Sequence, residues 1–227
     1  DDVLLDEAEL TRRLTAVFEA PGYKPPRLPD VAVSILELSR RPEASFEEFA
    51  ALLEQDPMLA GEVMKLVHSP IYAGQAAIKT IQQALVRIGI KNLRDIVLQA
   101  ALGMRVFRCD AYRETMDRLR LHAAACGQLC RIVCRYTTVE AEYAFLCGLL
   151  HDVGIAATLI ALAEGSAKKP PELLAIWPAV ERVHPRAAQK MTELWGLPAD
   201  IGLAVGAHHQ VKIQGYPHPL AATVCVA

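Results

Sequence analysis

AFLCGLLHDVGIAATLIALA, residues 144–163, contains a single formal charge, Asp152, with His151 beside it. A carboxylate within so apolar a segment costs several kcal/mol unless it is paired, hydrogen-bonded or bound to a metal. The length of the segment would suit a membrane span. The ionisable pair at its centre and the charge-rich helical patterns on either side instead favour the buried core of a soluble helical domain. We therefore predict that this segment forms the core and that a partner group or ion compensates Asp152.

The composition is that of a globular protein without a strong charge bias. The chain has 227 residues, of which 52% are hydrophobic, enough for one large domain or two small ones with a well-filled core. Lys and Arg number 24 and Asp and Glu number 26, so the net charge of -2 provides no general attraction to nucleic acid or to an anionic membrane. We expect neither a nucleic acid nor a membrane as a partner.

The cysteines indicate a reducing compartment. Six of them occur without a CxxC pair and mostly within apolar helical pattern, at positions 109, 126, 130, 134, 147 and 225. This usage is typical of reduced, buried thiols and predicts a cytoplasmic protein. The opening DDVLLDEAEL is acidic where a secretory signal would be basic, so no such signal is expected there.

The first half of the chain is predicted to begin with a helix and a linker. Residues 2–20 carry apolar residues on a helical period among charges, which indicates an amphipathic helix. This helix could pack on the following domain or continue into an upstream module. Residues 21–30 contain four prolines and a glycine and are expected to form a linker, with a new unit beginning near Leu28.

Several capping signals then predict helix starts. Ser45 with Glu48 three residues later is a capping box, which opens a helix that ends near residue 55. Asp56 is an N-cap residue followed by Pro57 at the first helical position. Thr80 is expected to cap a helix that ends at residue 89, and Asn92 is a candidate cap for a second helix to about residue 107.

The second half is also predicted to be helical. A long helix is expected over residues 110–136, and helical pattern resumes at Glu172. His184-Pro185 is expected to open a further helix, and Pro198 another that includes His208 and His209. Residues 211–219 read as loop, and residues 220–227 are apolar without a cap, as if a helix continued beyond them.

These patterns predict an all-α protein, because the chain shows neither βαβ alternation nor a hairpin signal such as Asn-Gly. A DNA-binding helix-turn-helix over residues 80–97 is an alternative of the right length. Packing within a bundle is favoured instead, because the second helix offers only four polar side chains to a groove, those of Lys91, Asn92, Arg94 and Gln99.

His122, Cys126, Cys130 and Cys134 follow one another at i+4 spacing along the predicted helix over residues 110–136 and share one face. They climb about 18 Å at 1.5 Å per residue, so they cannot all bind one ion. The three cysteines are therefore interpreted as small core residues.

A constellation of histidines and one carboxylate lies beside the apolar core: His122, His151, Asp152, His184, His208 and His209. Imidazole and carboxylate ligands suit iron, manganese, zinc or nickel, and a carboxylate can bridge two ions. Neighbouring His208 and His209 would point about 100° apart on a helix, so they would serve two ions or only one of them would be a ligand.

The order of these residues resembles a known superfamily. LCGLLHDVGI is similar to the central His-Asp helix of the HD superfamily of metal-dependent phosphohydrolases, and residues 184–210 resemble HD-GYP phosphodiesterases and their relatives, the HDOD proteins. Residues 28–98 resemble the HDOD family specifically, through the Leu-Pro start, Asp56-Pro57 and the run that contains Ala84, Leu85, Arg87 and Gly89. The resemblance covers about residues 26–227.

This resemblance implies an HD-domain-like multi-helix bundle with an N-terminal helical subdomain. Residues 1–25 would be a helix and proline-rich linker, and residues 26–227 the HDOD domain, divided into 26–110 and 111–227 and truncated at its C-terminus. HDOD proteins are bacterial signalling output domains, commonly joined to receiver, GGDEF or EAL modules, and most lack proven enzymatic activity. The implied partner is a regulatory protein or a fused signalling domain.

The resemblance also implies one or two divalent ions bound by His122, His151, Asp152, His184, His208 and His209. Three departures from the HD-GYP pattern matter: Ile155 replaces a lysine and cannot contact phosphate, Gln210 replaces a glutamate, and the aspartate that closes the ligand set would fall just beyond Ala227. Gly215-Tyr216-Pro217 does echo the GYP triplet.

Two functions remain open from the sequence. The first is a non-catalytic signalling and interaction module whose cluster is a structural metal site or a vestige. The second is a metal-dependent phosphohydrolase acting on a nucleotide such as cyclic di-GMP.

Overall fold

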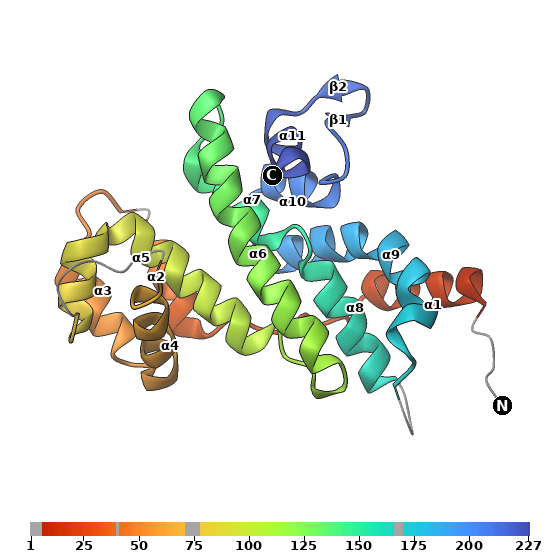
Figure 1. Ribbon diagram of the computed structural model, residues 1–227, viewed down its shortest axis with the longest axis horizontal. Coiled ribbons are helices and arrows are strands. Elements are labelled where there is room, and N and C mark those ends of the chain that lie inside the picture. Colours follow the sequence, from red (N-terminus) through yellow and green to blue (C-terminus); the bar gives the residue numbers. More distant parts are fainter. Residues whose placement is uncertain (1–5, 40, 71–77, 166–169) are drawn as a thin grey trace. The chain divides into compact units, whose positions relative to one another are not determined.

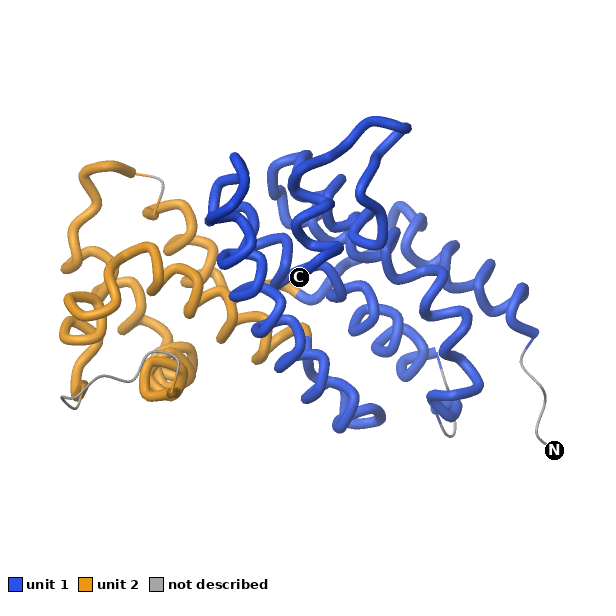
Figure 2. Tube along the Cα trace, turned by 45° about the horizontal axis from the view of Figure 1, so that its top comes forward, with its two compact units in different colours: residues 1–26, 107–227 blue, residues 27–106 orange. Residues whose placement is uncertain are grey.

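The computed structural model describes residues 6–39, 41–70, 78–165 and 170–227. These residues are helical apart from turns, loops and one small hairpin, which confirms the all-α prediction (Figure 1). The chain divides into two compact units, residues 27–106 and residues 1–26 with 107–227 (Figure 2). The N-terminal helix therefore belongs to the same unit as the second half of the chain.

The unit of residues 27–106 consists of helices packed on a long helix. Helices α2 (Asp30–Leu38), α3 (Phe46–Leu53) and α4 (Pro57–Val67) all contact α5 (Ile81–Arg105). Its core is made of fully buried aliphatic and aromatic side chains, among them those of Ile35, Phe49, Leu59, Leu85, Leu93 and Ile96. The predicted N-caps at Ser45, Asp56 and Thr80 are confirmed, because each side chain accepts a hydrogen bond from the backbone of the first helical turn.

Helix α5 consists of two helices that meet at a kink, so the predicted helix end at residue 89 is confirmed. Gly89 has a φ of 75° and a ψ of 162°, which are not helical values and separate the two helices. Glycine takes a positive φ without the steric cost that a Cβ would add, so the chain kinks there and resumes the helix at once. Asn92 does not cap; its side chain donates a hydrogen bond to the carbonyl of Ile88 at 2.7 Å.

The capping box at α3 gives a measurable contribution to stability. The Glu48 amide donates to Ser45 Oγ at 3.2 Å, and the Ser45 amide donates to the Glu48 carboxylate at 2.8 Å. We expect Ser45→Ala to lower the free energy of unfolding by about 1 kcal/mol, because an N-terminal amide loses its acceptor. Urea denaturation measures this, and Ser45→Asp, which keeps an acceptor, should retain most of the stability. An unchanged midpoint for Ser45→Ala would contradict the expectation.

The other unit contains the remaining elements. They are α1 (Glu7–Glu19), a 3-10 turn (Asp110–Tyr112), α6 (Arg113–Val133), a second 3-10 turn (Cys134–Tyr136), α7 (Ala141–Leu150), α8 (Val153–Glu164), α9 (Leu173–Leu194), α10 (Ala199–Gly206), β1 (Lys212–Ile213), β2 (Tyr216–Pro217) and α11 (Pro219–Val226). Helix α6 packs on α7, α8 packs on α9, and α10 contacts both α7 and α9.

Helix α1 packs on α9 through Leu10, Leu14 and Phe18, which are buried. The packing confirms the first alternative for the amphipathic helix, that it packs on the following domain. The predicted residues 2–5 of that helix lie outside the described part of the chain. The indole N–H of Trp195 donates to the carbonyl of Pro26 at 3.1 Å, which ties the end of the linker to the end of α9.

The central apolar segment forms two helices rather than one. Helix α7 ends and α8 begins at His151 and Asp152. By length and composition alone, residues Tyr143–Glu164 could cross a membrane. However, 72% of the apolar 18-residue stretch within them is buried inside the protein. Both helices are part of the core, as predicted.

Helix α9 runs through the position where a helix start was predicted. His184 and Pro185 lie in its interior, and Pro178 is a second internal proline. Pro185 has no amide hydrogen and therefore removes the helical hydrogen bond to the carbonyl of Glu181, which is an exposed residue. Burial of the α9 face that includes Val183 and Ala187 outweighs this loss.

The prediction of a plain loop over residues 211–219 was wrong. Strands β1 and β2 pair in antiparallel fashion, with Lys212 opposite Pro217 and Ile213 opposite Tyr216. The two residues between the strands, Gln214 and Gly215, have φ values of 51° and 83°. Positive φ at both turn positions matches the twist of a two-residue hairpin. Gln-Gly is a less usual signal for this turn than Asn-Gly.

Candidate metal centre

The structure brings all six predicted residues together within one unit. His122 lies on α6, His151 follows the last residue of α7, and Asp152 precedes the first residue of α8. His184 lies in the middle of α9, and His208 and His209 lie in the turn after α10. The break between α7 and α8 places the carboxylate where the three other segments meet: α6, α9 and the turn after α10.

The carboxylate of Asp152 stands between two pairs of imidazoles. Its Oδ2 is 3.4 Å from Nε2 of His122 and 3.2 Å from Nε2 of His151. Its Oδ1 is 3.6 Å from Nε2 of His184 and 3.4 Å from Nε2 of His208. Each oxygen therefore faces its own pair of nitrogen donors, an arrangement in which one carboxylate can serve two ions.

The imidazoles also approach one another closely. Nε2 of His122 is 3.1 Å from Nε2 of His151, and Nε2 of His184 is 3.2 Å from that of His208 and 3.1 Å from that of His209. The sequence pattern predicted His208 and His209 on a helix, where they would diverge. The helix ends at Gly206, and in the following turn both rings reach His184.

Backbone carbonyls fix the orientation of three of these rings. Nδ1 of His151 lies 2.7 Å from the carbonyl oxygen of Gly148, Nδ1 of His208 lies 2.6 Å from that of Val205, and Nδ1 of His184 lies 3.3 Å from that of Val180. A carbonyl only accepts, so each Nδ1 carries a proton, and whenever one of these rings is neutral its Nε2 lone pair points into the centre. Lone pairs so close together repel unless a cation lies among them.

The donor set fits a divalent metal. For metal–nitrogen bonds of about 2.0–2.1 Å, neighbouring donors lie about 2.8–3.0 Å apart in octahedral and about 3.3–3.4 Å apart in tetrahedral coordination, a range of about 2.8–3.4 Å. The three Nε2–Nε2 distances, 3.1, 3.2 and 3.1 Å, fall within that range. Nitrogen donors with a shared carboxylate are compatible with iron, manganese, zinc and nickel alike.

At Asp152, His184 and His209 the local electrostatics favour the protonation states that a metal needs. Burial opposes ionisation of Asp152, but hydrogen bonds from His151 and His208 outweigh it and hold the pKa of that carboxyl far below its usual range. Burial lowers the pKa of His184 to about 4 and also lowers the pKa of His209. Burial lowers the pKa of His151 too, but its hydrogen bond to Asp152 leaves the pKa raised. At neutral pH Asp152 is therefore ionised, while His184 and His209 are neutral.

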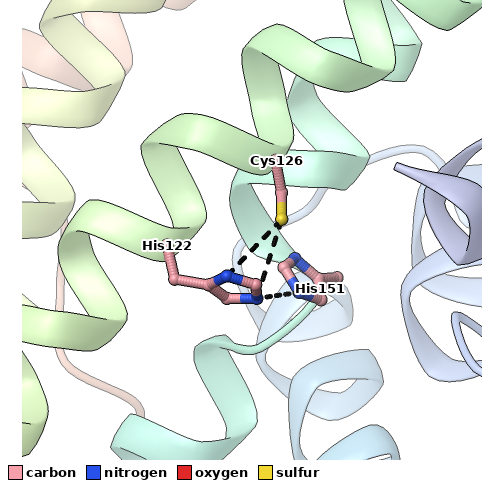
Figure 3. Close-up of side chains that lie close together, drawn as sticks. All are labelled: His122, Cys126 and His151. Atoms are coloured by element: carbon pink, nitrogen blue, oxygen red, sulfur yellow. Dashed lines mark hydrogen bonds between the residues drawn. The ribbon is translucent and has the colours of Figure 1, made fainter.

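Cys126 is a residue of this centre that the sequence analysis missed. It is buried, as predicted for a core thiol, but its Sγ lies 3.6 Å from Nε2 and 3.7 Å from Nδ1 of His122 (Figure 3). The ligand atoms of His122, Cys126 and His151 all lie within 4.8 Å of one another, as do those of His184, His208 and His209. The i+4 spacing of His122 and Cys126 was the available signal.

Two glycines allow the close helix packing that assembles the centre. A Cβ on Gly154 would lie 2.0 Å from the carbonyl oxygen of His184 and 2.6 Å from the amide nitrogen of Ala188, so α8 and α9 touch backbone to backbone there. A Cβ on Gly148 would lie 2.6 Å from Sγ of Cys130 and 2.7 Å from the carbonyl oxygen of Cys126, at the contact between α6 and α7.

Comparison with protein families matches the HDOD domain to residues 26–211. The chain belongs to the HDOD family. This confirms the resemblance deduced from the sequence. A relative of this HDOD chain is an uncharacterized protein of Treponema pallidum (strain Nichols), 26% identical over 220 residues, which cover 89% of this chain and 41% of that protein. The HDOD chain thus spans about two fifths of the length of this relative.

Solved structures share the fold of this HDOD chain. A candidate metal-dependent phosphohydrolase from Shewanella amazonensis SB2B has a TM-score of 0.74 and 18% identity, over 96% of this chain and 81% of that one. An HDOD domain protein with unknown function from Geobacter sulfurreducens has a TM-score of 0.68 and 22% identity, over 96% and 76%. A candidate signal transduction protein from Marinobacter aquaeolei VT8 has a TM-score of 0.65 and 20% identity, over 99% and 54%.

Proposed function

We propose that this HDOD chain is a non-catalytic signal-transduction module of a bacterial cytoplasm, in which the histidine centre binds one or two divalent metal ions as a structural element. The observation that carries the proposal is the convergence of four Nε2 atoms on the two oxygens of Asp152. The donors come from α6, α9, the break between α7 and α8, and the turn after α10. An ion there would join helices that are distant in sequence.

The residues present define what metal binding would contribute. His122, His151, Asp152, His184, His208 and His209 would hold the metal, which would supply the positive charge that their lone pairs and the carboxylate require. Because the unfolded chain has no assembled site, binding free energy would add to the stability of the folded unit. The carbonyls of Gly148, Val180 and Val205 keep three rings turned toward the centre.

Two observations support a signal-transduction module that does not hydrolyse phosphodiesters. Ile155, at the position where the HD-GYP pattern has a phosphate-contacting lysine, is 5% exposed and packs in the core. The Treponema pallidum relative is much longer than this chain, as expected where an HDOD domain is one part of a larger protein. The partner we propose is accordingly a regulatory protein or a fused signalling domain.

A second candidate function is a metal-dependent phosphohydrolase acting on a nucleotide such as cyclic di-GMP. The observation that favours it is the exposure of two of the candidate ligands. The side chain of His122 is 51% exposed, and His209 is also exposed. His151, His184 and His208 are buried. Substrate could thus approach a metal held here. Bound metal would polarise a phosphate and lower the pKa of a coordinated water.

One experiment separates these functions. The protein, purified without chelators, is subjected to elemental analysis and is assayed for hydrolysis of cyclic di-GMP and of a generic phosphodiester with added Mn²⁺ or Fe²⁺. We expect bound metal in stoichiometric amount and no turnover. Turnover that depends on the metal would replace the first function by the second. Protein that stays empty after incubation with each of Mn²⁺, Fe²⁺, Zn²⁺ and Ni²⁺ would overturn metal binding and leave only the family assignment.

A further inference from the structure

The two groups of donors on either side of Asp152 are not equivalent. His184, His208 and His209 offer three imidazole nitrogens on the Oδ1 side. On the Oδ2 side, His122 and His151 offer two nitrogens and the third donor atom is the sulfur of Cys126. The centre is symmetric in the number of side chains but not in their chemistry.

Cys126 lies close enough to His122 to share an ion with it after rotation of one of the two side chains. Its Sγ is almost equally far from the two ring nitrogens of His122, at 3.6 and 3.7 Å, so it lies beside the ring and off the N–H or lone-pair direction of either nitrogen (Figure 3). For zinc–sulfur bonds of about 2.3 Å and zinc–nitrogen bonds of about 2.0–2.1 Å, tetrahedral sulfur and nitrogen donors are separated by about 3.5–3.6 Å. The distance from Sγ to Nε2 of His122 agrees with that separation.

The neighbouring cysteines of α6 do not share this position. Sγ of Cys130 lies against Gly148 and 4.0 Å from the carbonyl oxygen of Thr223. Sγ of Cys134 lies 3.0 Å from the carbonyl oxygen of Arg131. Cys130 is fully buried and, of these residues, only Cys126 faces the imidazoles of His122 and His151. Cys130 is therefore a matched control, one turn farther along the same helix.

We propose that the thiolate of Cys126 is a metal ligand and completes a four-donor site with His122, His151 and Asp152. The inference rests on the metal binding proposed above and specifies which metal each half of the centre prefers. A thiolate with two imidazoles favours zinc over the harder manganese, whereas three imidazoles with a carboxylate discriminate less. On binding, the thiol releases one proton to solvent as the sulfur–metal bond forms.

A four-donor site that includes Cys126 would affect whether a substrate could reach the metal. Structural zinc sites have four protein ligands, whereas catalytic sites keep one position open for water or substrate. A sulfur donor on the Oδ2 side would close that half of the centre. The half with His184, His208 and His209 also offers four protein donors, because Asp152 Oδ1 faces it. Tetrahedral ions in both halves would therefore leave no open position, which agrees with the non-catalytic function proposed above.

Cobalt substitution tests the role of Cys126. The metal-free full chain is titrated with Co²⁺, and the near-ultraviolet sulfur-to-cobalt charge-transfer absorption is recorded beside the visible bands of bound cobalt. We expect this absorption in the wild type and in Cys130→Ser and its loss in Cys126→Ser. We also expect the preference for Zn²⁺ over Mn²⁺, measured by competition, to fall at least about tenfold in Cys126→Ser only.

The outcomes separate this inference from the proposed function. Cobalt that binds the wild type without the charge-transfer absorption, or an absorption that survives in Cys126→Ser, would overturn the thiolate ligand and leave the metal centre intact. A wild-type protein that binds no metal would overturn both. Because the wild-type spectrum is informative by itself, the test does not depend on the folding of a variant.

Discussion

Gly154→Ala should destabilise the unit that contains the metal centre by at least about 3 kcal/mol, at the upper end of the usual cost of overpacking a core. The added Cβ would meet the carbonyl oxygen of His184 at 2.0 Å and the amide nitrogen of Ala188 at 2.6 Å. Both are backbone atoms of α9, so no side-chain rotation relieves the contact and α8 must move away from α9. Urea denaturation followed by circular dichroism measures the loss.

The same substitution should weaken metal binding, because α8 begins at Asp152 and α9 holds His184. Gly22→Ala is the matched control in the same unit, since a Cβ there meets nothing within 4 Å and Gly22 has no positive φ. The control should be neutral or more stable by up to about 1 kcal/mol. A Gly154→Ala protein with the wild-type midpoint would show that α8 and α9 are farther apart than described.

Replacing His151 and Asp152 together by alanine should abolish metal binding at both halves of the centre. His151 belongs to one group of donors, and Asp152 faces both. The wild type should also lose thermal stability when a chelator is added, by about 4 kcal/mol if the metal was present at 1,000 times its dissociation constant. The double variant should be insensitive to chelator. Elemental analysis after gel filtration and melting curves with and without chelator measure both effects.

His218→Ala provides the control for the double variant. His218 lies in the same unit but outside the centre, where its Nδ1 accepts a hydrogen bond from the amide of Ala221 and caps α11. This control should keep its metal while it loses a cap worth about 1 kcal/mol. Undiminished metal content in a folded His151→Ala, Asp152→Ala protein would show that other residues are the ligands.

The sequence predicted best what depends on neighbouring residues. The hydrogen bonds at Ser45, Asp56 and Thr80 join a side chain to an amide two or three positions away, so the order of residue types is sufficient to identify them. The burial of residues 144–163 could also be predicted, because so apolar a segment, with a single charge at its centre and charge-rich helices on either side, favours a core position. The six candidate ligands were found through their order along the chain and through family resemblance.

What depends on distant contacts was missed. Pro185 is a helix-breaking signal locally, and only the packing of the surrounding α9 face keeps the helix continuous. Cys126 resembled Cys130 in the sequence apart from its i+4 spacing from His122. The packing of α6 on α7 adds His151, whose ligand atom lies within 4.8 Å of the sulfur of Cys126. His208 and His209 converge because α10 ends before them, and helix ends are the least certain feature of a pattern.

The packing of α1 on α9 also sets the order in which this chain can complete its folding. The contiguous unit, residues 27–106, has its whole core available as soon as α5 has been synthesised. Helix α1 precedes that unit in the sequence, but the surface that covers Leu10, Leu14 and Phe18 belongs to α9, which is synthesised after the whole of residues 27–106. The apolar face of α1 therefore stays uncovered while the contiguous unit is made, and the unit that holds the histidine centre closes after it.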